Sequence, residues 1–418
     1  MAGYGLIGEK LGYSYSAIIH GMLGAYDYQL IPLEKSELDA FMKKRDFKGL
    51  NVTIPYKKTV MGYCDRVSPL AEKLGAVNTL YFDEDGALCG TNTDYPGFLK
   101  VASSAGISFQ GKKVLVLGDG GAGGMVRHAV KDSGAASVIV ASRKPETSPA
   151  KDGFEVVSYE DLPSQTDAQV IVNSTPVGMY PDTGKSLITL SDFPDCEGVF
   201  DVIYNPYYTE LLLQAKKAGI PHANGLSMLV SQATEAAAYF TGTPGWDEKD
   251  QDILAALRKE SENIVLIGMP GSGKTTIGKK LAQMTGKTFV DMDEEIEKNA
   301  DMSIPDIFEK YGEPHFRDLE SRAAESLGKE SSLIIATGGG VILRENNMDA
   351  LTQNGRIVLL KKDIDKLATD GRPLSTDMYA LKKMQETRGP LYEKYGEFSL
   401  DVTPRGPDEN AKIIADLL

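Results

Sequence analysis

Two glycine-rich loops in the sequence combine residue types and spacing that bind phosphate groups. The first has Gly118, Gly120 and Gly123 in the pattern G-x-G-x-x-G, and in the second, residues 268–275 read G-x-x-x-x-G-K-T. Glycine lets backbone N–H groups approach a phosphate closely, and the amino end of a following helix adds positive potential. The sequence therefore predicts two nucleotide sites of different types.

The first loop predicts a dinucleotide site in a βαβ unit. An apolar run over 114–117 precedes the glycines, a helical pattern follows them, and a second predicted strand spans 137–141. Sites that prefer NAD usually carry Asp or Glu at the end of this second strand to bind the ribose hydroxyls, whereas this chain has Ser142, Arg143 and Lys144 there. Guanidinium and ammonium groups suit a 2′-phosphate, so we expect NADP; a solvated basic turn is the alternative.

The second loop predicts phosphoryl transfer. In this pattern the loop N–H groups hold phosphates, Lys274 neutralises them and the Thr275 hydroxyl reaches Mg²⁺. We expect the strand predicted over 288–290 to present Asp291 and Asp293 on the same side of an extended segment. Asp291 would help to hold Mg²⁺, and Asp293 would orient the attacking hydroxyl or accept its proton. A helix N-cap is the alternative interpretation of Asp293.

The two loops must be positioned by separate sets of elements. Apolar residues from Leu226 to Phe240 recur at helical spacing, and T-G-T-P-G at 241–245 ends that helix. An acidic helix is predicted over 246–260, and we expect a short linker near 260–263.

Composition argues against several classes of function. The 418 residues are 42% hydrophobic and 25% charged, which suits two or three globular units of roughly 150 residues each. A net charge of −14 opposes attachment to nucleic acid or anionic lipid, so we expect neither partner. The three cysteines lack C-x-x-C spacing, and no apolar run approaches the ~18 residues of a spanning helix. We therefore expect a soluble cytoplasmic protein.

A set of separated motifs over residues 4–257 resembles the shikimate dehydrogenase family. The motifs are G-L-I-G at 5–8, S-Y-S at 14–16, N-V-T-I-P-Y-K at 51–57, G-A-V-N-T at 75–79, G-T-N-T-D at 90–94, N-S-T-P-V-G-M at 173–179, D-V-I-Y-N-P at 201–206 and N-G-L-S-M at 224–228. Two positions depart from the family pattern, because Tyr13 and Ala17 stand where it often has His and Pro.

By this resemblance, Lys57 and Asp94 form the catalytic pair. An ammonium group held by a carboxylate can donate a proton to a carbonyl oxygen while a nicotinamide delivers hydride to the carbon. The resemblance also places the substrate at Ser14, Ser16, Thr53, Asn78, Tyr204 and Gln232. It places the cofactor along Gly118, Gly120, Gly121, Ala122, Ser142, Arg143, Lys144, Ser174, Thr175, Val202, Gly225 and Met228. Core packing is the alternative for Val202 and Met228, and a backbone cap is the alternative for Asn78.

After the second loop, four ordered segments resemble shikimate kinase, over about 263–418. They are F-R-D-L-E at 316–320, G-G-G at 338–340, R-P-L at 372–374 and R-G-P-L-Y at 388–392. The resemblance implies that Arg317 and Arg388 bind the substrate carboxylate, which suits a planar bidentate donor, while Gly339 and Gly340 admit the ring. It assigns ATP to Pro270, Gly271, Ser272, Gly273, Lys274 and Thr275, with Arg372 on a mobile lid and Arg405 at the adenine. For each arginine alone, a surface ion pair is the alternative.

These observations together predict an α/β protein of three units. We expect a discontinuous substrate domain over 1–100 and 225–260, a Rossmann NADP-binding domain over 101–224, and a P-loop kinase domain with a mainly parallel sheet over 261–418. The implied reactions are consecutive: NADPH reduces 3-dehydroshikimate to shikimate, and ATP with Mg²⁺ then phosphorylates shikimate. A quinate/shikimate dehydrogenase of broader specificity fused to the kinase, and a catalytically inactive ligand-sensing homologue, are the alternatives.

Overall fold

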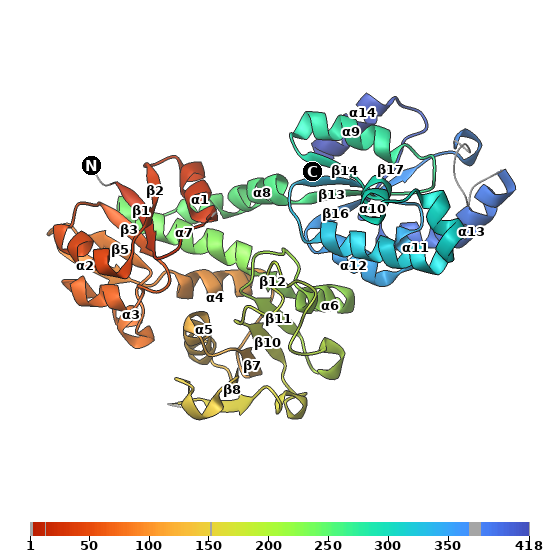
Figure 1. Cartoon of the computed structure of the whole chain (residues 1–418). Helices are drawn as coiled ribbons and strands as arrows, with labels where there is room; N and C mark the ends of the chain where they lie inside the picture. The colour runs from red at the N-terminus through yellow and green to blue at the C-terminus, as the bar shows by residue number, and fades with distance from the viewer. Residues whose placement is uncertain (1–2, 13, 151–152, 368–377, 418) are drawn as a thin grey trace. The chain divides into compact units, whose positions relative to one another are not determined.

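Three β-sheets organise the computed structural model, which describes residues 3–12, 14–150, 153–367 and 378–417 (Figure 1). The sheets belong to two units, Met1–Ala256 and Leu257–Leu418. The boundary falls within helix α8 (Asp250–Ser261), which follows the 3₁₀ turn η5 (Trp246–Lys249). Because strand β13 begins at Asn263, one residue separates the helix from the strand, where the sequence analysis predicts a short linker.

The first sheet is mixed and carries strands in the order β2-β1-β3-β5-β6-β4. The strands are β1 (Tyr4–Gly8), β2 (Tyr28–Pro32), β3 (Gly49–Val52), β4 (Arg66–Val67), β5 (Thr79–Phe82) and β6 (Leu88–Thr91). Helices α1 (Tyr15–Leu23), α2 (Lys35–Lys44) and α3 (Pro69–Leu74) and the 3₁₀ turn η1 (Thr59–Tyr63) connect them. Ile7, Leu50 and Leu80 lie on adjacent strands and are fully buried in one apolar cluster that holds this sheet against its helices.

Two long helices, α4 (Asp94–Ser104) and α7 (Gly225–Thr241), pack closely against each other in the first unit. On α7, Leu226, Val230 and Phe240 are buried, which confirms the predicted helical spacing. A Cβ on Gly97 of α4 would lie 3.0 Å from the backbone nitrogen of Gln232 on α7. Glycine at this position therefore lets the two helix backbones approach, which brings the residues at the start of α4 near those of α7.

The second sheet is entirely parallel and has the order β12-β11-β10-β7-β8-β9. Its strands are β7 (Lys113–Leu117), β8 (Ser137–Ser142), β9 (Glu155–Ser158), β10 (Val170–Asn173), β11 (Gly198–Asp201) and β12 (His222–Asn224). Helices α5 (Gly121–Asp132) and α6 (Glu210–Ala218) and 3₁₀ turns η2 (Pro145–Thr147), η3 (Leu162–Ser164) and η4 (Leu190–Asp192) join them. The chain leaves β7 toward β8 and β9, then returns to β10 on the other side of β7. Ligands of such sheets bind where the strand order reverses, outside the carboxyl ends of the strands.

The second unit has a parallel sheet in the order β14-β15-β13-β16-β17. Its strands are β13 (Asn263–Ile267), β14 (Thr288–Asp291), β15 (Leu333–Ala336), β16 (Gly355–Lys361) and β17 (Phe398–Asp401). The helices are α9 (Lys274–Thr285), α10 (Met292–Ala300), α11 (Ile304–Gly328), α12 (Glu345–Thr352), α13 (Met378–Tyr395) and α14 (Pro407–Leu417), with 3₁₀ turns η6 (Val341–Leu343) and η7 (Ile364–Lys366). The predicted α/β class, with mainly parallel sheets, is confirmed.

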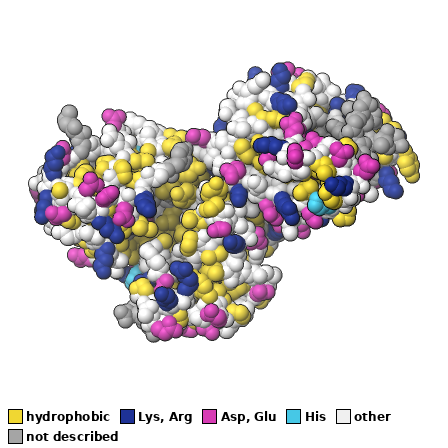
Figure 2. All heavy atoms as spheres, viewed as in Figure 1, with side chains coloured by type: hydrophobic (Ala, Val, Ile, Leu, Met, Phe, Trp, Pro, Cys, Tyr) yellow, Lys and Arg dark blue, Asp and Glu magenta, His cyan; other side chains and the backbone are white. Residues whose placement is uncertain are grey.

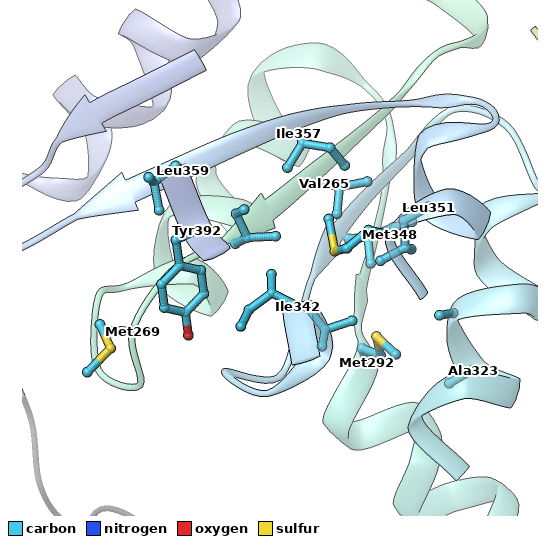
Figure 3. Packing of buried hydrophobic residues seen from close by; sticks show 14 of the residues in the cluster. Val265, Met269, Met292, Ala323, Ile342, Met348, Leu351, Ile357, Leu359 and Tyr392 are labelled. Carbon is cyan, nitrogen blue, oxygen red and sulfur yellow. The ribbon is translucent and has the colours of Figure 1, made fainter. Parts of the chain in front are cut away.

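Both faces of this sheet are covered by apolar side chains. Val265 and Ile267 of β13 belong to one buried cluster, whereas Ile264 and Leu266 belong to another. Figure 3 shows the first cluster, in which strand residues meet side chains from α10, α12 and α13, among them Tyr392. This near-continuous apolar run is typical of a strand buried on both sides. Every helix among the described residues is too short or too polar to cross a membrane.

Candidate active sites

The Lys57 ammonium and the Asp94 carboxylate meet in the first unit. Lys57 Nζ donates to Asp94 Oδ2 at 2.5 Å, although the two residues are 37 positions apart. Lys57 lies in the loop after β3, where the neighbouring Tyr56 is buried and donates its hydroxyl to the Leu33 carbonyl oxygen. Asp94 begins α4. The pair is partly accessible, with side-chain exposures of 32% and 19%, so a small molecule can reach it.

Asn78 holds the turn that carries Asp94. Its side chain accepts a hydrogen bond from the Thr93 backbone nitrogen at 2.7 Å and donates to the Thr93 hydroxyl at 3.1 Å. Asn51, which the sequence analysis overlooked, continues this buried network by accepting the Tyr28 hydroxyl and donating to Thr79. The structure thus shows the capping role of Asn78, and its contact with substrate stays a prediction.

The remaining predicted substrate residues come from four segments of the first unit. Ser14 is the N-cap of α1 and accepts from the Ser16 backbone nitrogen at 3.3 Å. Between them, Tyr15 makes an edge-to-face contact with Tyr204, whose ring centroid is 5.8 Å away.

Thr53 follows β3, and its backbone N–H group donates to the Ile7 carbonyl oxygen of β1. The buried Gln232 side chain donates to the Leu229 carbonyl oxygen. Tyr13 lies outside the described residues. Figure 2 shows hydrophobic side chains gathered where this unit is hollowed, in the region of α4 and α7.

Close backbone approaches require glycine at two positions of the dinucleotide loop and at Gly225, which begins α7. Gly118 has φ 101°, and a Cβ on Gly123 would lie 2.3 Å from the Gly118 carbonyl oxygen, so α5 can abut β7 only with glycine there. A Cβ on Gly225 would lie 1.9 Å from the Val202 carbonyl oxygen. By contrast Gly120, Gly121 and Ala122 are exposed at the amino end of α5, which leaves its N–H groups open to an anion.

Two predicted cofactor residues turn their hydroxyls toward the protein. Ser174 donates to the Leu117 carbonyl oxygen at 2.8 Å, and Thr175 donates to the Asn173 side chain at 2.7 Å. Ser174 therefore fastens the loop after β10 to the end of β7, whereas the Thr175 bond stays within its own segment. Val202 and Met228 pack against the apolar cluster of this sheet, so core packing, the alternative for both, is what the structure shows.

The end of β8 carries the predicted basic residues, and an acidic side chain from the glycine loop also reaches it. Arg143 and Lys144 are exposed there, as a 2′-phosphate site needs. The buried Ser142 hydroxyl donates to Asp119 Oδ2 at 2.9 Å and accepts from the Lys144 backbone nitrogen at 3.1 Å. Asp119 was missed in the sequence analysis, although an acid inside a glycine loop is a visible signal.

The second unit forms a phosphate loop at the amino end of α9. Gly268, Gly271 and Gly273 have φ values of 144°, 82° and 99°, and Gly273 is the N-cap of the helix. Lys274 Nζ donates to the Gly268 and Met269 carbonyl oxygens at 2.8 and 3.1 Å, so it closes the loop on itself. Pro270 lies against the glycine triplet, because a Cβ on Gly339 would lie 2.9 Å from its ring. Gly271 is partly exposed, and Ser272 is buried.

The predicted extended geometry of Asp291 and Asp293 is wrong. Asp291 ends β14 and is the N-cap of α10, and its Oδ1 accepts the Asp293 backbone nitrogen at 3.1 Å. Asp293 lies in the first turn of the helix, where carboxylates are favoured by the helix dipole. Asp291 Oδ2 also accepts the Thr275 hydroxyl at 2.7 Å. A hydroxyl and a carboxylate beside a phosphate loop offer oxygen atoms of the kind that Mg²⁺ binds, with water and phosphate as its other ligands.

Arg317, Glu320 and Asp293 converge on the glycine triplet. Arg317 Nη1 donates to Glu320 Oε2 at 2.8 Å, and a Cβ on Gly340 would lie 2.0 Å from that nitrogen. A Cβ on Gly338 would lie 2.7 Å from Asp293 Oδ1 and 3.1 Å from Glu320 Oε1. Burial raises the pKa of Glu320, and Arg317 opposes this rise. Glu320 was missed in the sequence analysis, although its spacing of three residues from Arg317 on a helix indicates an ion pair.

The other predicted kinase arginines have separate surroundings. Arg388 Nη1 donates to the Gly339 carbonyl oxygen at 2.9 Å, beside the Tyr392 hydroxyl, which donates to the same oxygen at 2.6 Å. Arg405 pairs with Glu409 at 3.2 Å on the surface, so its adenine contact stays a prediction. Arg372 lies outside the described residues.

Comparisons with known proteins divide the chain in the same places. A family model described as the shikimate dehydrogenase substrate binding domain matches residues 6–80, and a shikimate kinase model matches residues 270–418. A shikimate dehydrogenase (NADP⁺) of Clostridium beijerinckii is 38% identical over 245 residues, which are 56% of this chain and 89% of the relative.

Two solved structures are similar to the first unit. A Thermus thermophilus shikimate 5-dehydrogenase in complex with NADP(H) and shikimate has a TM-score of 0.54 and 32% identity, covering 61% of this chain and 100% of its own. A Corynebacterium glutamicum quinate dehydrogenase in complex with NAD has a TM-score of 0.54 and 30% identity, covering 61% of this chain and 99% of its own.

Proposed function

Because the chain belongs to the shikimate dehydrogenase family and carries a shikimate kinase domain at 270–418, we propose that one polypeptide performs two consecutive reactions on the same carboxylic acid. The first unit reduces 3-dehydroshikimate to shikimate with NADPH. The second transfers the terminal phosphoryl group of ATP to shikimate. The observation that carries the proposal is that one chain contains both the Lys57–Asp94 pair and the Arg317 cluster beside a phosphate loop.

In the reduction, Lys57 acts as the proton donor. Its ammonium group polarises the carbonyl oxygen of the substrate and transfers a proton to it, while Asp94 holds the ammonium in place. NADPH, when bound, supplies the hydride that reaches the carbonyl carbon. The open amino end of α5 would receive its pyrophosphate, and Arg143 and Lys144 would receive the 2′-phosphate.

In the phosphorylation, each charged group has a separate task. Asp293 takes the proton of the attacking hydroxyl, and Arg317 with Arg388 binds the substrate carboxylate. Lys274 neutralises phosphate charge after leaving the loop carbonyls that it contacts in this structure. Thr275 and Asp291 would hold Mg²⁺, which neutralises the transferring phosphate when it is bound.

A coupled assay with single-site variants tests the proposal. Lys57→Ala is expected to abolish NADPH oxidation by 3-dehydroshikimate and to spare ADP formation from added shikimate, whereas Lys274→Ala does the reverse. Lys58→Ala and Lys279→Ala are matched controls, because both lysines are exposed neighbours of the mutated positions. Equal loss of both activities in either catalytic variant would contradict the assignment of one reaction to each unit. Lack of both activities in the wild type would support a ligand-sensing homologue instead.

A second candidate for the first unit is quinate oxidation. The similarity to a quinate dehydrogenase bound to NAD favours it. Rates with shikimate and with quinate, each measured with NADP⁺ and NAD⁺, distinguish the two candidates. The main proposal requires the highest kcat/KM for the pair shikimate and NADP⁺.

A further inference from the structure

Strand β8 ends without the acid that binds the ribose hydroxyls in NAD sites, but an acid reaches that place from the glycine loop. Asp119 lies between Gly118 and Gly120, and its Oδ2 accepts the Ser142 hydroxyl at 2.9 Å. Ser142 is the last residue of β8, and it is fixed by the Lys144 backbone N–H group. The carboxylate of Asp119 is therefore held at the tip of β8, and it stays partly exposed.

The buried guanidinium of Arg127 lies near the Asp119 carboxylate. Arg127 of α5 is 8% exposed, and its Nε and Nη1 have no hydrogen-bond partner in the part of the chain that the structure describes. Burial lowers the pKa of Arg127, and the nearby Asp119 carboxylate opposes this change. Arg143 and Lys144, the two residues after Ser142, are exposed. The Arg127 guanidinium attracts the Asp119 carboxylate, so charge attraction as well as the Ser142 hydroxyl holds the carboxylate at the strand end.

We propose that Asp119 is a cofactor-specificity residue: its carboxylate accepts hydrogen bonds from the adenosine ribose hydroxyls of NADH and repels the 2′-phosphate of NADPH. This inference rests on the proposed dehydrogenase function. Arg143 and Lys144 attract the 2′-phosphate, whereas Asp119 opposes it at the same strand end. The first unit therefore uses both cofactors, and its preference for NADPH is smaller than its two cations alone would produce.

Two variants separate the effect of the Asp119 charge on the 2′-phosphate from the effect of its oxygen acceptors on the ribose hydroxyls. Asp119→Asn removes the charge but keeps an oxygen acceptor, so the KM for NADPH is expected to fall while the KM for NADH changes little. Asp119→Ala removes charge and acceptor, so the KM for NADPH falls and that for NADH rises. For Asp119→Ala we expect the ratio of kcat/KM values, NADPH over NADH, to rise roughly tenfold, as the loss of one charge interaction implies.

A matched control removes the same charge elsewhere in this domain. Asp167 pairs with Lys113 at the amino end of β7, whereas Ser142 lies at the carboxyl end of the parallel strand β8, so Asp167→Asn should leave the ratio unchanged. A ratio in Asp119→Ala that stays within about twofold of the wild type, or that falls, overturns the inference.

Binding measurements keep this test independent of turnover. Calorimetric titration with NADP⁺ and NAD⁺ reports Kd values for wild type and variants even if no substrate is reduced. Asp119→Ala should tighten NADP⁺ and weaken NAD⁺. If the wild type binds both cofactors but reduces no 3-dehydroshikimate, the proposed function fails while the Kd ratio still decides the role of Asp119.

Discussion

The carboxylate of Glu320 is the buried counter-charge of Arg317, with Oε2 2.8 Å from Nη1 on the same helix. Glu320 is 1% exposed in its side chain, whereas Glu313, the other carboxylate that binds Arg317, is 47% exposed. Removing the counter-charge of a buried guanidinium costs far more free energy than removing the counter-charge of a guanidinium on the surface. This geometry predicts that Glu320 positions Arg317, the group proposed to bind the shikimate carboxylate.

We therefore expect Glu320→Gln to raise the KM for shikimate in the kinase reaction by roughly tenfold, because Arg317 is no longer held by charge. The matched control Glu313→Gln is expected to change this KM by less than about twofold, since the Glu313 carboxylate is about half exposed to solvent. ADP release at varied shikimate measures both variants. Equal effects of the two would contradict a special role for Glu320.

Gly340 is constrained by the same guanidinium. Because a Cβ would lie 2.0 Å from Arg317 Nη1, Gly340→Ala must displace the side chain that is proposed to bind the carboxylate. We expect a loss of kinase kcat/KM of about 100-fold, comparable to a misplacement of about 1 Å. NADPH oxidation should be unaffected. Gly406→Ala is the control, because a Cβ there meets nothing within 4 Å. Full kinase activity in Gly340→Ala would mean that Arg317 is not needed in this position.

The hydrogen bond between Thr275 and Asp291 predicts where Mg²⁺ is held. Asparagine can replace aspartate as an N-cap of α10, so Asp291→Asn removes the charge with little effect on the helix. We expect the Mg²⁺ concentration for half-maximal kinase activity to rise roughly tenfold, because one charged ligand is lost. Glu294→Gln removes an exposed charge in the same turn and serves as the control. An unchanged Mg²⁺ requirement in Asp291→Asn would exclude this residue as a ligand.

His20 makes the stability of the first unit depend on pH. Its ring is fully buried, stacks on Tyr28 at 3.9 Å and shares a hydrogen bond with the Tyr26 hydroxyl. Burial lowers the pKa of His20 to about 3, below its ordinary value of 6.5. At pH values between these two pKa values, the ring binds a proton in the unfolded chain but not in the folded chain. Lowering the pH through this range therefore favours unfolding.

Urea unfolding of wild type and His20→Gln measures this effect. The free energy of unfolding of the wild type relative to the variant should fall by about 1 to 2 kcal/mol between about pH 7 and about pH 5. Trp246 is the single tryptophan and lies in the first unit, so its fluorescence reports this unit. A difference that stays constant over this range would show that His20 does not remain neutral when buried.

Local patterns in the sequence were sufficient for the two phosphate loops and for the fold class. Each loop depends on glycines next to one strand and one helix, and short continuous runs of apolar residues mark the strands themselves. The helix over 225–241 followed from its apolar spacing in the same way. The predicted geometry of Asp291 and Asp293 was wrong because the Asp291 side chain caps the amino end of α10. The chain therefore begins a helix at Met292 and does not continue as an extended strand through Asp293.

Contacts between distant segments could not be obtained in this way. Asp119 reaches the end of β8, Lys57 meets Asp94, and Glu320 points at the glycine triplet because of strand order and helix packing. Spacing along a chain defines backbone conformation over a few residues, since the interactions that set it are local. The distance between side chains on different strands depends on which elements pack together. The sequence therefore identifies the reacting groups, and the folded structure determines which partners and charges surround them.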